Sequence, residues 1–318
     1  MLAVVLAAGR GKRLRPLTDD RSKAMLPIAG RPMLERVMEM LERAGVSEFI
    51  VVVHPDDCDL IALLTNDRWQ NRVALAYQAQ REGMAAALAC AVPLIADAGV
   101  DEFVLASCDN IYPEGHAEAL ILHRRKAGLD AALTFLRVRP EQIPTLAVVA
   151  IKNGLVTQIV EKPQPEDAPS DLGVPSLYVL STNALDYLPQ VPLSSRGERE
   201  FPDVLRLMIQ DGRRVSGVTI DERMTLTRPD DLLTLNRHML RIDPAAAGVP
   251  GDLSIDTVVY SPVRIEAGVT LGKGCKIGPD VSIETGATVG DGCCVRNAVI
   301  LRGASIADGQ RIADCVIA

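Results

Sequence analysis

A short loop rich in glycine and basic residues separates the first apolar run of this chain from its first amphipathic segment. The loop contains Gly9 and Gly11, and the basic residues Arg13 and Lys23 follow. Glycines let backbone N–H groups approach phosphate oxygens, and basic side chains neutralise a triphosphate or a departing pyrophosphate. A dinucleotide-binding fingerprint would need glycine where Leu14 stands, and a Walker loop would need other residues as well. The loop therefore predicts a phosphate site of a different type.

A carboxylate stands at the carboxyl end of a later apolar run. Asp109 lies in Ser107-Cys108-Asp109-Asn110, directly after the aliphatic residues 103–106. The carboxyl ends of parallel strands share one edge of a sheet, where ligands bind, and carboxylate oxygens are ligands that Mg²⁺ prefers. An aspartate in this place can instead cap a helix. We favour a magnesium ligand because the glycine-rich loop follows a strand expected in the same sheet.

The elements that must position these residues follow from apolar patterning. Short aliphatic runs alternate with amphipathic segments up to about residue 240, which is typical of a mainly parallel sheet covered by helices. Asn153-Gly154 between two aliphatic runs predicts an antiparallel hairpin. Strands are expected at residues 2–7, 49–53, 73–77 and 103–106, with a helix from Pro32 that Gly45 ends.

An aliphatic residue recurs at every sixth position in the last quarter of the chain. The series runs from Leu253 to Leu301, and Ile306 and Ile312 continue it after a one-residue slip. This period is typical of a left-handed parallel β-helix of hexapeptide repeats, whereas an antiparallel sheet would show a period of two. We therefore predict a domain at 1–240, a linker at 241–252 and a β-helix at 253–318.

Composition narrows the function classes. The formal charge is −7, from 34 basic and 41 acidic residues, which disfavours nucleic acid and membrane surfaces as partners. Seven cysteines without a Cys-x-x-Cys pair indicate reduced thiols and a cytoplasmic location. The apolar start is too short for a signal peptide or a membrane span.

The loop ending at Lys23 resembles the signature loop of the sugar-1-phosphate nucleotidylyltransferase family. The Asp109 segment, Glu161-Lys162-Pro163 and the strand around Tyr178 are also similar to family motifs. The resemblance implies a Rossmann-like sheet of the nucleotide-diphospho-sugar transferase type and an EC 2.7.7 activity. It implies nucleotide binding by Ala8, Gly9, Gly11, Arg13, Gln78 and Gly83, sugar-phosphate binding by Glu161, Lys162 and Tyr178, magnesium (Mg2+) binding by Asp109, and catalytic roles for Arg13, Lys23, Asp109 and Lys162.

Plainer interpretations exist for some of these residues. Gln78 and Gly83 also suit a polar turn before a helix, and Glu161 and Lys162 suit a surface charge pair. The family typically has a second metal-binding aspartate where this chain has Thr225. A hydroxyl is a weak ligand, so the metal loses an anionic partner, recruits Asp221, or depends on water and nucleotide phosphates.

The resemblance implies transfer of a nucleotidyl group from a nucleoside triphosphate to a sugar 1-phosphate. Gln78 can pair with a pyrimidine imide edge, so dTTP or UTP with glucose 1-phosphate is the first choice. GTP with mannose 1-phosphate is the alternative, and Thr225 also suits a catalytically weak regulatory subunit that binds sugar nucleotides. No histidine follows His238, which disfavours acetyltransferase activity in the β-helix. We expect the β-helix to join subunits into a homo-oligomer.

Overall fold

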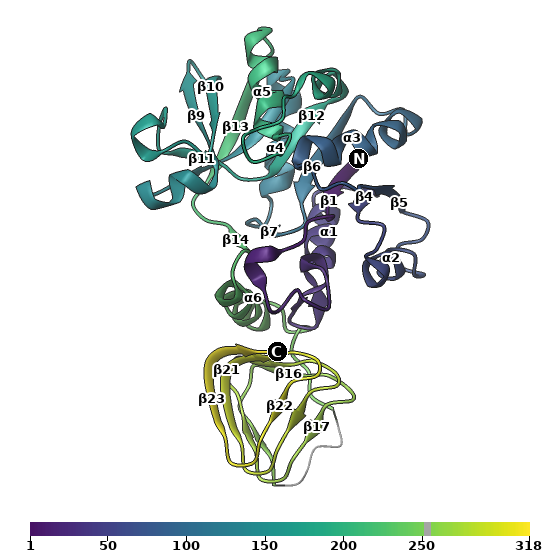
Figure 1. Ribbon diagram of the computed structural model, residues 1–318, viewed down its shortest axis with the longest axis vertical. Helices are drawn as coiled ribbons and strands as arrows, with labels where there is room; N and C mark the ends of the chain where they lie inside the picture. Colours follow the sequence, from purple (N-terminus) through teal and green to yellow (C-terminus); the bar gives the residue numbers. More distant parts are fainter. Residues whose placement is uncertain (251–255) are drawn as a thin grey trace. The chain divides into compact units, whose positions relative to one another are not determined.

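A computed structural model of the chain describes residues 1–250 and 256–318 (Figure 1). Its contacts divide the chain into two compact units, residues 1–9 with 37–223 and residues 10–36 with 224–318. The domain boundaries 1–240, 241–252 and 253–318 stay a prediction, and Gly251, Asp252 and Leu253 lie outside the described residues.

The first unit is built on a ten-stranded mixed sheet in the order β10-β9-β11-β8-β12-β6-β1-β4-β5, with β13 also paired to β8. The pairs among β5, β4, β1 and β6 are parallel, whereas β12 runs antiparallel to β6 and β8. The α/β prediction is confirmed, with parallel pairing concentrated in the first half. The strands are β1 Leu2–Leu6, β4 Glu48–Val53, β5 Val73–Tyr77, β6 Glu102–Ser107, β8 Ala131–Arg137, β9 Ala147–Lys152, β10 Leu155–Glu161, β11 Leu172–Val174, β12 Leu177–Ser181 and β13 Val215–Ile220.

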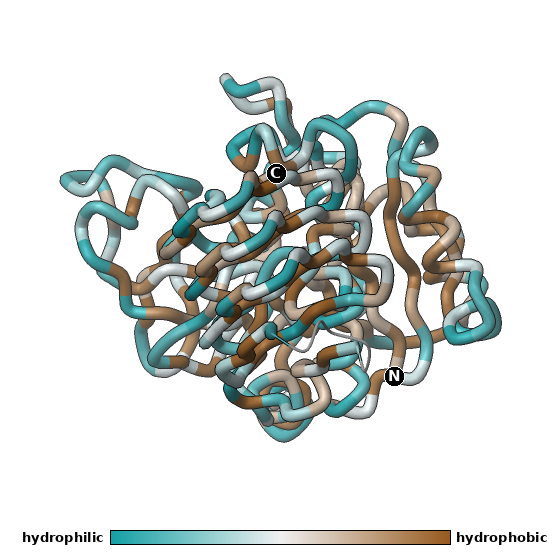
Figure 2. The backbone as a smooth tube through the Cα atoms, turned by 90° about the horizontal axis from the view of Figure 1, so that it is seen from below, coloured by the Kyte–Doolittle hydropathy of each residue, from teal (hydrophilic) through white to brown (hydrophobic). Residues whose placement is uncertain are grey.

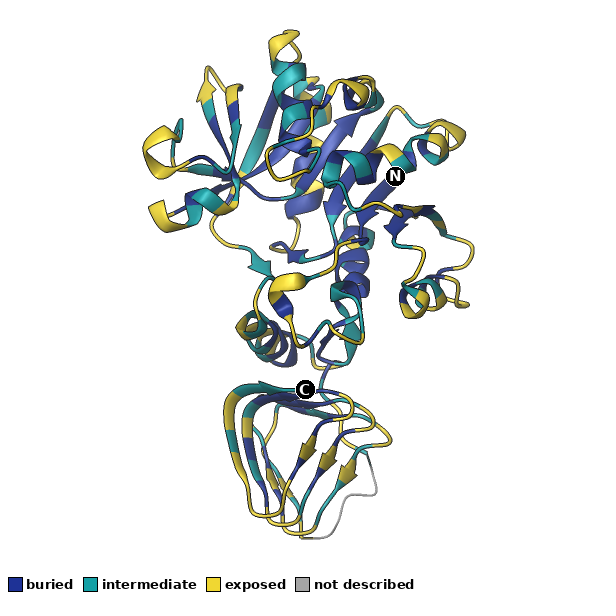
Figure 3. Cartoon of the chain, in the orientation of Figure 1, coloured by how far each residue is buried: buried dark blue, intermediate teal, exposed yellow. Residues whose placement is uncertain are grey.

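Helices cover this sheet. Val4 and Leu6 of β1 pack in one apolar cluster with Leu88 of α3 and Val204 of α5. Every residue of β1 is buried, as expected for a parallel strand with both faces covered, and Figure 3 shows the central strands in dark blue. The helical segments are α1 Met33–Arg43, which begins in the second unit, α2 Cys58–Leu64, α3 Met84–Asp97, α4 His116–Ala127, η3 Pro140–Thr145, η4 Pro165–Asp167, η5 Thr182–Gln190 and α5 Phe201–Gln210; the short strand β7 is Asn110–Ile111.

The predicted hairpin is confirmed. β9 and β10 pair antiparallel, and Lys152 lies opposite Leu155 across the turn. Asn153 and Gly154 have φ of 52° and 78°, the left-handed values that a two-residue type I′ turn requires at both positions. The strand that ends at Glu161 is thereby fixed against the rest of the sheet.

The second unit contains a parallel β-helix with three short strands in each coil. Val259 pairs with Ile277 and Ile277 with Val295, a step of 18 residues in each case (277 − 259 and 295 − 277). Figure 2 shows these coils stacked, with brown hydrophobic stretches between teal corners. The β-helix prediction is confirmed, and its left-handedness stays a prediction. The strands are β15 Val258–Val259, β16 Val263–Ile265, β17 Thr270–Leu271, β18 Lys276–Ile277, β19 Val281–Ile283, β20 Thr288–Val289, β21 Cys294–Ile300, β22 Ser305–Ile306 and β23 Arg311–Ile317.

One position of the six-residue series was predicted wrongly. Ile283 pairs with Ile300, so Ile300, and not Leu301, takes the inward position of the series in the core cluster of the β-helix, although Leu301 is buried as well. The reason lies in a shortened corner. Three residues separate Ile277 from the next strand, whereas two separate Val295 from Ala298, which pairs with the start of that strand. The slip therefore precedes residue 300.

The rest of the second unit packs around helix α6, Pro229–Ile242. Arg241 near its end forms a bidentate ion pair with the buried carboxylate of Asp280, with contacts of 2.8 and 2.5 Å, at a corner of the β-helix. Asn236 accepts a hydrogen bond from the Ala29 N–H at 2.7 Å. The other elements of this unit are η1 Lys12–Leu14, η2 Lys23–Met25, β2 Pro27–Ile28, β3 Arg31–Pro32 and β14 Met224–Thr225.

Two further expectations concern the whole chain. All seven cysteines are free, as their spacing predicts. Within residues 1–250 and 256–318, no helix combines the length and the apolar character that crossing a lipid bilayer requires.

Candidate active site

The glycine-rich loop follows β1 and is divided between the two units. Ala7 donates its N–H to the Val52 carbonyl oxygen at 2.8 Å, and the Ala8 carbonyl oxygen accepts a hydrogen bond from Arg81 Nε at 2.7 Å. Arg81 therefore fixes the start of the loop. No sequence motif indicates this role for Arg81. A Cβ built on Gly9 would meet no described atom within 4 Å, so the packing of the protein does not itself demand glycine there.

The second part of the loop lies in the second unit. Gly11 has a left-handed φ of 62°, and a Cβ there would lie 3.1 Å from both Lys23 Cβ and Thr18 Cγ2. The Thr18 hydroxyl donates to the Gly11 carbonyl oxygen at 3.0 Å. Glycine at this position therefore lets the Lys23 segment fold closely over the loop, with Lys23 half-buried and Arg13 exposed.

The carboxylate of Asp109 is held in a tight polar turn at the end of β6. Its Oδ1 accepts hydrogen bonds from the Ser107 hydroxyl at 2.6 Å and from Asn110 Nδ2 at 2.7 Å. The Cys108 N–H donates to the Leu6 carbonyl oxygen at 3.1 Å, which joins this turn to the end of β1. The sequence located Asp109, but the structure adds Ser107 and Asn110 as the groups that orient it.

Arg223 closes the other side of the same turn. Its Nη1 donates to Asn110 Oδ1. Burial raises the pKa of the Tyr112 and Tyr178 phenols, and the positive charge of Arg223 opposes that rise for both. The guanidinium therefore lies within electrostatic reach of two buried tyrosines and of the Asp109 turn. No motif in the sequence predicts a role for Arg223.

The residues predicted to bind the sugar phosphate form an ion-paired cluster at the end of β10. Lys162 Nζ lies 2.8 Å from Glu161 Oε1, and Arg196 Nη2 lies 3.5 Å from the same oxygen and 2.7 Å from Glu200 Oε1. Burial raises the pKa of Glu161, although the charges of Lys162 and Arg196 lower it, and Glu200 adds to the rise. The pair is partly buried, with 17% of the Glu161 side chain and 34% of the Lys162 side chain exposed, so it is more than a solvated surface pair.

Lys162 also has an unusual backbone. Its φ is 45°, a left-handed value that lysine seldom adopts, and its N–H donates to the Leu146 carbonyl oxygen at 3.0 Å. Strained conformations of this kind persist where the surrounding structure imposes them, often at functional sites. The backbone at the end of β10 thus directs this lysine away from the course of an ordinary strand.

Tyr178 and Gln78 are both held by hydrogen bonds within the protein. Tyr178 is 2% exposed, its ring centroid lies 4.8 Å from that of Phe201, and its hydroxyl is hydrogen-bonded to Ser176. Gln78 is also buried, and its Nε2 donates to the Gly83 carbonyl oxygen at 3.3 Å. The turn interpretation of Gln78 therefore has a structural basis, and base recognition by its side chain stays a prediction.

Gly83 has a packing requirement of its own. Its φ is 96°, and a Cβ there would lie 2.6 Å from the Arg199 carbonyl oxygen. That oxygen accepts the Ala85 N–H at the start of α3. Glycine therefore allows the two segments to approach closely.

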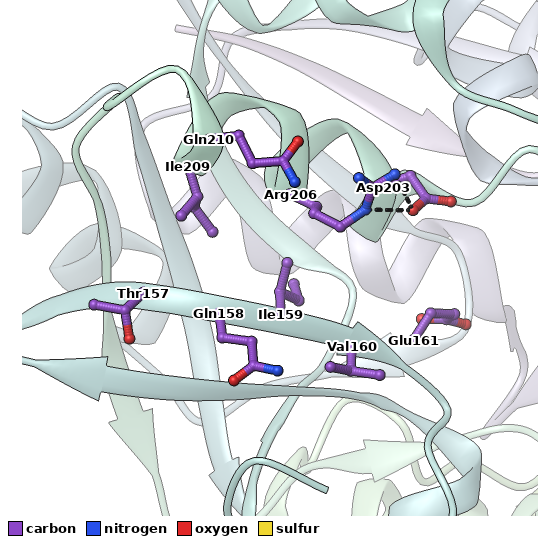
Figure 4. Close-up of a pocket in the computed structure, with 9 residues that line it drawn as sticks. All are labelled: Thr157, Gln158, Ile159, Val160, Glu161, Asp203, Arg206, Ile209 and Gln210. Atoms are coloured by element: carbon purple, nitrogen blue, oxygen red, sulfur yellow. Dashed lines mark hydrogen bonds and ion pairs between the residues drawn. The ribbon is translucent and has the colours of Figure 1, made fainter. Parts of the chain in front are cut away.

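A groove borders the sugar-phosphate cluster between β10 and α5 (Figure 4). Its volume is about 360 Å³, Ile159 and Ile209 contribute apolar surface, and Glu161 lies at one end. Asp203 and Arg206 form an ion pair at 3.0 Å on the α5 side of the groove. The groove adds solvent-accessible space next to Glu161.

The available donor side chains limit how a metal ion could bind. No group of three or more His, Cys, Asp or Glu side chains could hold a metal ion in the part of the chain that the structure describes. Thr225 belongs to the second unit, where its hydroxyl lies 3.0 Å from that of Thr227, and Asp221 is exposed. Mg²⁺ commonly takes one or two carboxylates and completes its shell with water and substrate phosphates. Asp109 fits such an ion if the nucleotide brings most of the other ligands.

Comparisons with known proteins identify the family of this chain. The family model described as nucleotidyl transferase matches residues 2–240, and the model described as GMPPB C-terminal domain matches residues 259–318. The chain is 31% identical over 235 residues to the UTP–glucose-1-phosphate uridylyltransferase AglF of Haloferax volcanii, covering 73% of this chain and 93% of the relative. It is also 31% identical over 243 residues to the low-salt glycan biosynthesis nucleotidyltransferase Agl11 of the same organism, with 76% of this chain and 66% of the relative covered.

The fold has a solved counterpart. A UDP-glucose pyrophosphorylase structure in complex with UDP-glucose superposes with a TM-score of 0.67 at 20% identity, covering 76% of this chain and 98% of the other. At this identity the likeness concerns the fold alone.

Proposed function

From the premise that the chain belongs to the nucleotidyl transferase family, as a sugar-1-phosphate nucleotidylyltransferase, we propose that it joins UTP or dTTP to glucose 1-phosphate and releases pyrophosphate. The observation that carries the proposal is the partly buried Glu161–Lys162 pair, whose lysine has a strained backbone. Together with the Asp109 turn in the same unit, it provides a cation for a phosphate and carboxylates for hydroxyls or a metal.

The proposed reaction is a direct displacement. An oxygen of the sugar phosphate attacks the α-phosphorus and forms a new P–O bond, while the bond from that phosphorus to the bridging oxygen breaks and pyrophosphate leaves with the electron pair. Lys162 orients the attacking phosphate, and Arg13 and Lys23 bind the departing one. Magnesium, when bound at Asp109, supplies charge neutralisation. Positioning and electrostatics therefore provide the catalysis, without a protein nucleophile.

The pyrimidine preference rests on Gln78 and on similarity to a uridylyltransferase. GTP with mannose 1-phosphate is the second candidate, because residues 259–318 match the GMPPB C-terminal domain. Pyrophosphate release should be measured with magnesium, five nucleoside triphosphates and the 1-phosphates of glucose, mannose and N-acetylglucosamine. Turnover only with UTP or dTTP and glucose 1-phosphate supports the proposal, and a preference for GTP with mannose 1-phosphate overturns its substrate choice.

The substitution of Thr225 for the family's aspartate supports one further candidate, a catalytically weak subunit that binds sugar nucleotides. The Thr225→Asp variant distinguishes this regulatory subunit from an active enzyme with an altered metal site. A large gain in turnover indicates a degenerate site, and unchanged turnover above a measurable wild-type rate indicates a working altered site. If the wild type shows no turnover with any substrate pair but still binds UTP, this result also favours the regulatory subunit.

We also propose that the β-helix joins subunits into a homo-oligomer, because its stacked coils offer a repetitive surface. Sedimentation velocity at micromolar concentration tests this. A single monomeric species would overturn it.

A further inference from the structure

A continuous hydrogen-bond chain runs from a guanidinium to the predicted metal ligand. Arg223 Nη1 donates to Asn110 Oδ1, and Asn110 Nδ2 donates to Asp109 Oδ1 at 2.7 Å. Asn110 Nδ2 also donates to the Ser107 hydroxyl at 2.7 Å. All four residues belong to the first unit. The positive end of this chain therefore polarises an amide that points its hydrogens at the Asp109 carboxylate.

The amide of Asn110 can occupy this place in one orientation. Asn110 is 3% exposed, and both ends of its side chain are hydrogen-bonded. A flipped amide would face its oxygen toward the Asp109 carboxylate and its NH₂ group toward the Arg223 guanidinium, which creates two repulsive contacts. Arg223 thus selects the orientation in which Asn110 donates to Asp109.

The charge of Arg223 is permanent, because a guanidinium does not lose its proton in proteins. Its neighbours Tyr112 and Tyr178 remain neutral, since burial raises the pKa of both phenols. The Tyr112 hydroxyl is buried and has no hydrogen-bond partner among the described residues. This corner of the site consequently combines a fixed cation with a buried, neutral phenol.

Arg223 is followed by Met224 and Thr225. Where the family typically has an aspartate, this chain has Thr225, so the segment lacks one negative charge, and Arg223 supplies a positive charge two residues earlier. The two features act in the same electrostatic direction: both disfavour a metal held by protein carboxylates, and both favour an anionic phosphate.

We propose that Arg223 is a positioning residue that orients Asn110 toward Asp109 and supplies resident positive charge, so that the free protein binds a divalent cation weakly and the nucleotide carries its magnesium into the site. This inference rests on the proposed function. We therefore expect phosphate binding at this site to depend less on metal than it would at a site in which two aspartates of the protein hold the ion.

Binding of Mn²⁺ to the nucleotide-free protein, measured by electron paramagnetic resonance, tests the charge of Arg223. The Arg223→Met variant removes the charge and should bind Mn²⁺ about tenfold more tightly, the effect of one partly screened like charge near the ion. Arg223→Lys keeps the charge and should bind Mn²⁺ as weakly as the wild type. Arg137→Met, which removes an exposed surface arginine, is the matched control. In the Asp109→Asn, Arg223→Met double variant the tightening should disappear, which places the ion at Asp109.

Binding of UTP in the presence of EDTA tests the second consequence. Arg223→Met should weaken UTP binding about tenfold, because it removes positive charge from a metal-free phosphate site. Arg223→Lys should recover part of this affinity, but not the turnover, because an ammonium lacks the planar donor geometry that orients Asn110. Thermal melting of each variant checks that the first unit is folded.

Equal Mn²⁺ and UTP affinities in the wild type and Arg223→Met would overturn the inference. If Arg223→Met does not fold, Arg223→Lys still decides: tighter Mn²⁺ binding or full wild-type turnover in that variant would contradict it. Failure of the proposed function appears separately, as absence of turnover by the wild type with every substrate pair, because the Mn²⁺ measurement does not depend on turnover.

Discussion

Glycine has different purposes in the β-helix and in the phosphate loop. A Cβ on Gly278 would lie 2.0 Å from the Tyr260 carbonyl oxygen, and one on Gly272 would lie 2.5 Å from the Asp291 nitrogen. Neighbouring coils therefore require glycine at these corners. Gly9, in contrast, has open space around its missing Cβ. The repeat glycines thus serve the fold, whereas no contact within the protein requires Gly9, whose role in phosphate binding stays a prediction.

Carboxylates differ between the same regions. In the β-helix, Asp308 Oδ1 accepts the Asp291 N–H at 2.9 Å and Glu266 Oε2 accepts the Thr285 N–H at 3.0 Å, so these acids hold adjacent coils together. Asp109 is held by two side chains at a strand end, and Glu161 is held by two cations. The β-helix carboxylates therefore satisfy backbone groups of adjacent coils, whereas Asp109 and Glu161 are oriented by side chains at the ends of strands.

The largest expected effect is a loss of activity when Asp109, outside the β-helix, is changed. Asp109→Asn should lower turnover about 10²- to 10³-fold, or about 3–4 kcal/mol, by removing a charge at the reacting phosphates. Its melting temperature should stay close to that of the wild type. Steady-state pyrophosphate release measures the loss, and Asp171→Asn, at an exposed surface pair, is the control. Wild-type turnover in Asp109→Asn would remove this residue from the mechanism.

Gly278→Ala should instead lower the stability of the β-helix. The added Cβ meets backbone at 2.0 Å and imposes a left-handed φ of 106° on alanine, so the free energy of unfolding should fall by about 3 kcal/mol. Gly274 shares the left-handed backbone but has open space around its missing Cβ. Gly274→Ala should therefore lower the free energy of unfolding by less. Urea unfolding measures both variants. Equal losses would show that backbone strain, and not coil contact, limits this corner.

A buried histidine makes the first unit sensitive to acid. Burial lowers the pKa of His116 from 6.5 to about 4, and its Nε2 lies 2.9 Å from the Thr134 hydroxyl. The unfolded chain therefore binds a proton at a higher pH than the folded chain does, and stability falls as pH drops from 6.5 toward 4. Between pH 7 and pH 5, protonation of His116 should lower the free energy of unfolding by about 2 kcal/mol.

His116→Gln, which keeps a polar group near Thr134, should flatten that pH dependence. Urea unfolding at pH 5 and 7 measures it, and His123→Gln serves as the matched control. If His116→Gln loses as much stability as the wild type between the two pH values, another group is responsible.

The smallest effect is expected at the surface. Arg137 Nη1 lies 2.9 Å from Asp171 Oδ2, but the two side chains are 75% and 56% exposed. Solvent screens such a pair, so Arg137→Ala should change the free energy of unfolding by no more than about 0.5 kcal/mol and leave turnover unchanged. A larger change in denaturant unfolding would mean that exposure is a poor guide to importance in this chain.

The sequence by itself determined the class of fold and most of the candidate residues. Continuous aliphatic runs gave the parallel strands, Asn153-Gly154 gave the hairpin, and the six-residue period gave the β-helix, because each depends on a local periodicity or on the conformational range of one residue. Asp109 was found as a carboxylate directly after an aliphatic run, whereas Lys162 was found through the resemblance of its segment to a family motif.

The tertiary structure alone decided which side chains meet. Arg81 contacts Ala8, Arg196 contacts Glu161 and Arg223 contacts Asn110 across gaps of 73, 35 and 113 residues (81 − 8, 196 − 161 and 223 − 110), and no local pattern encodes contacts of such separation. The shortened corner before Ile300 was missed for a related reason. The alternative register differs by one residue between two adjacent aliphatic positions, and only pairing with the preceding coil distinguishes them.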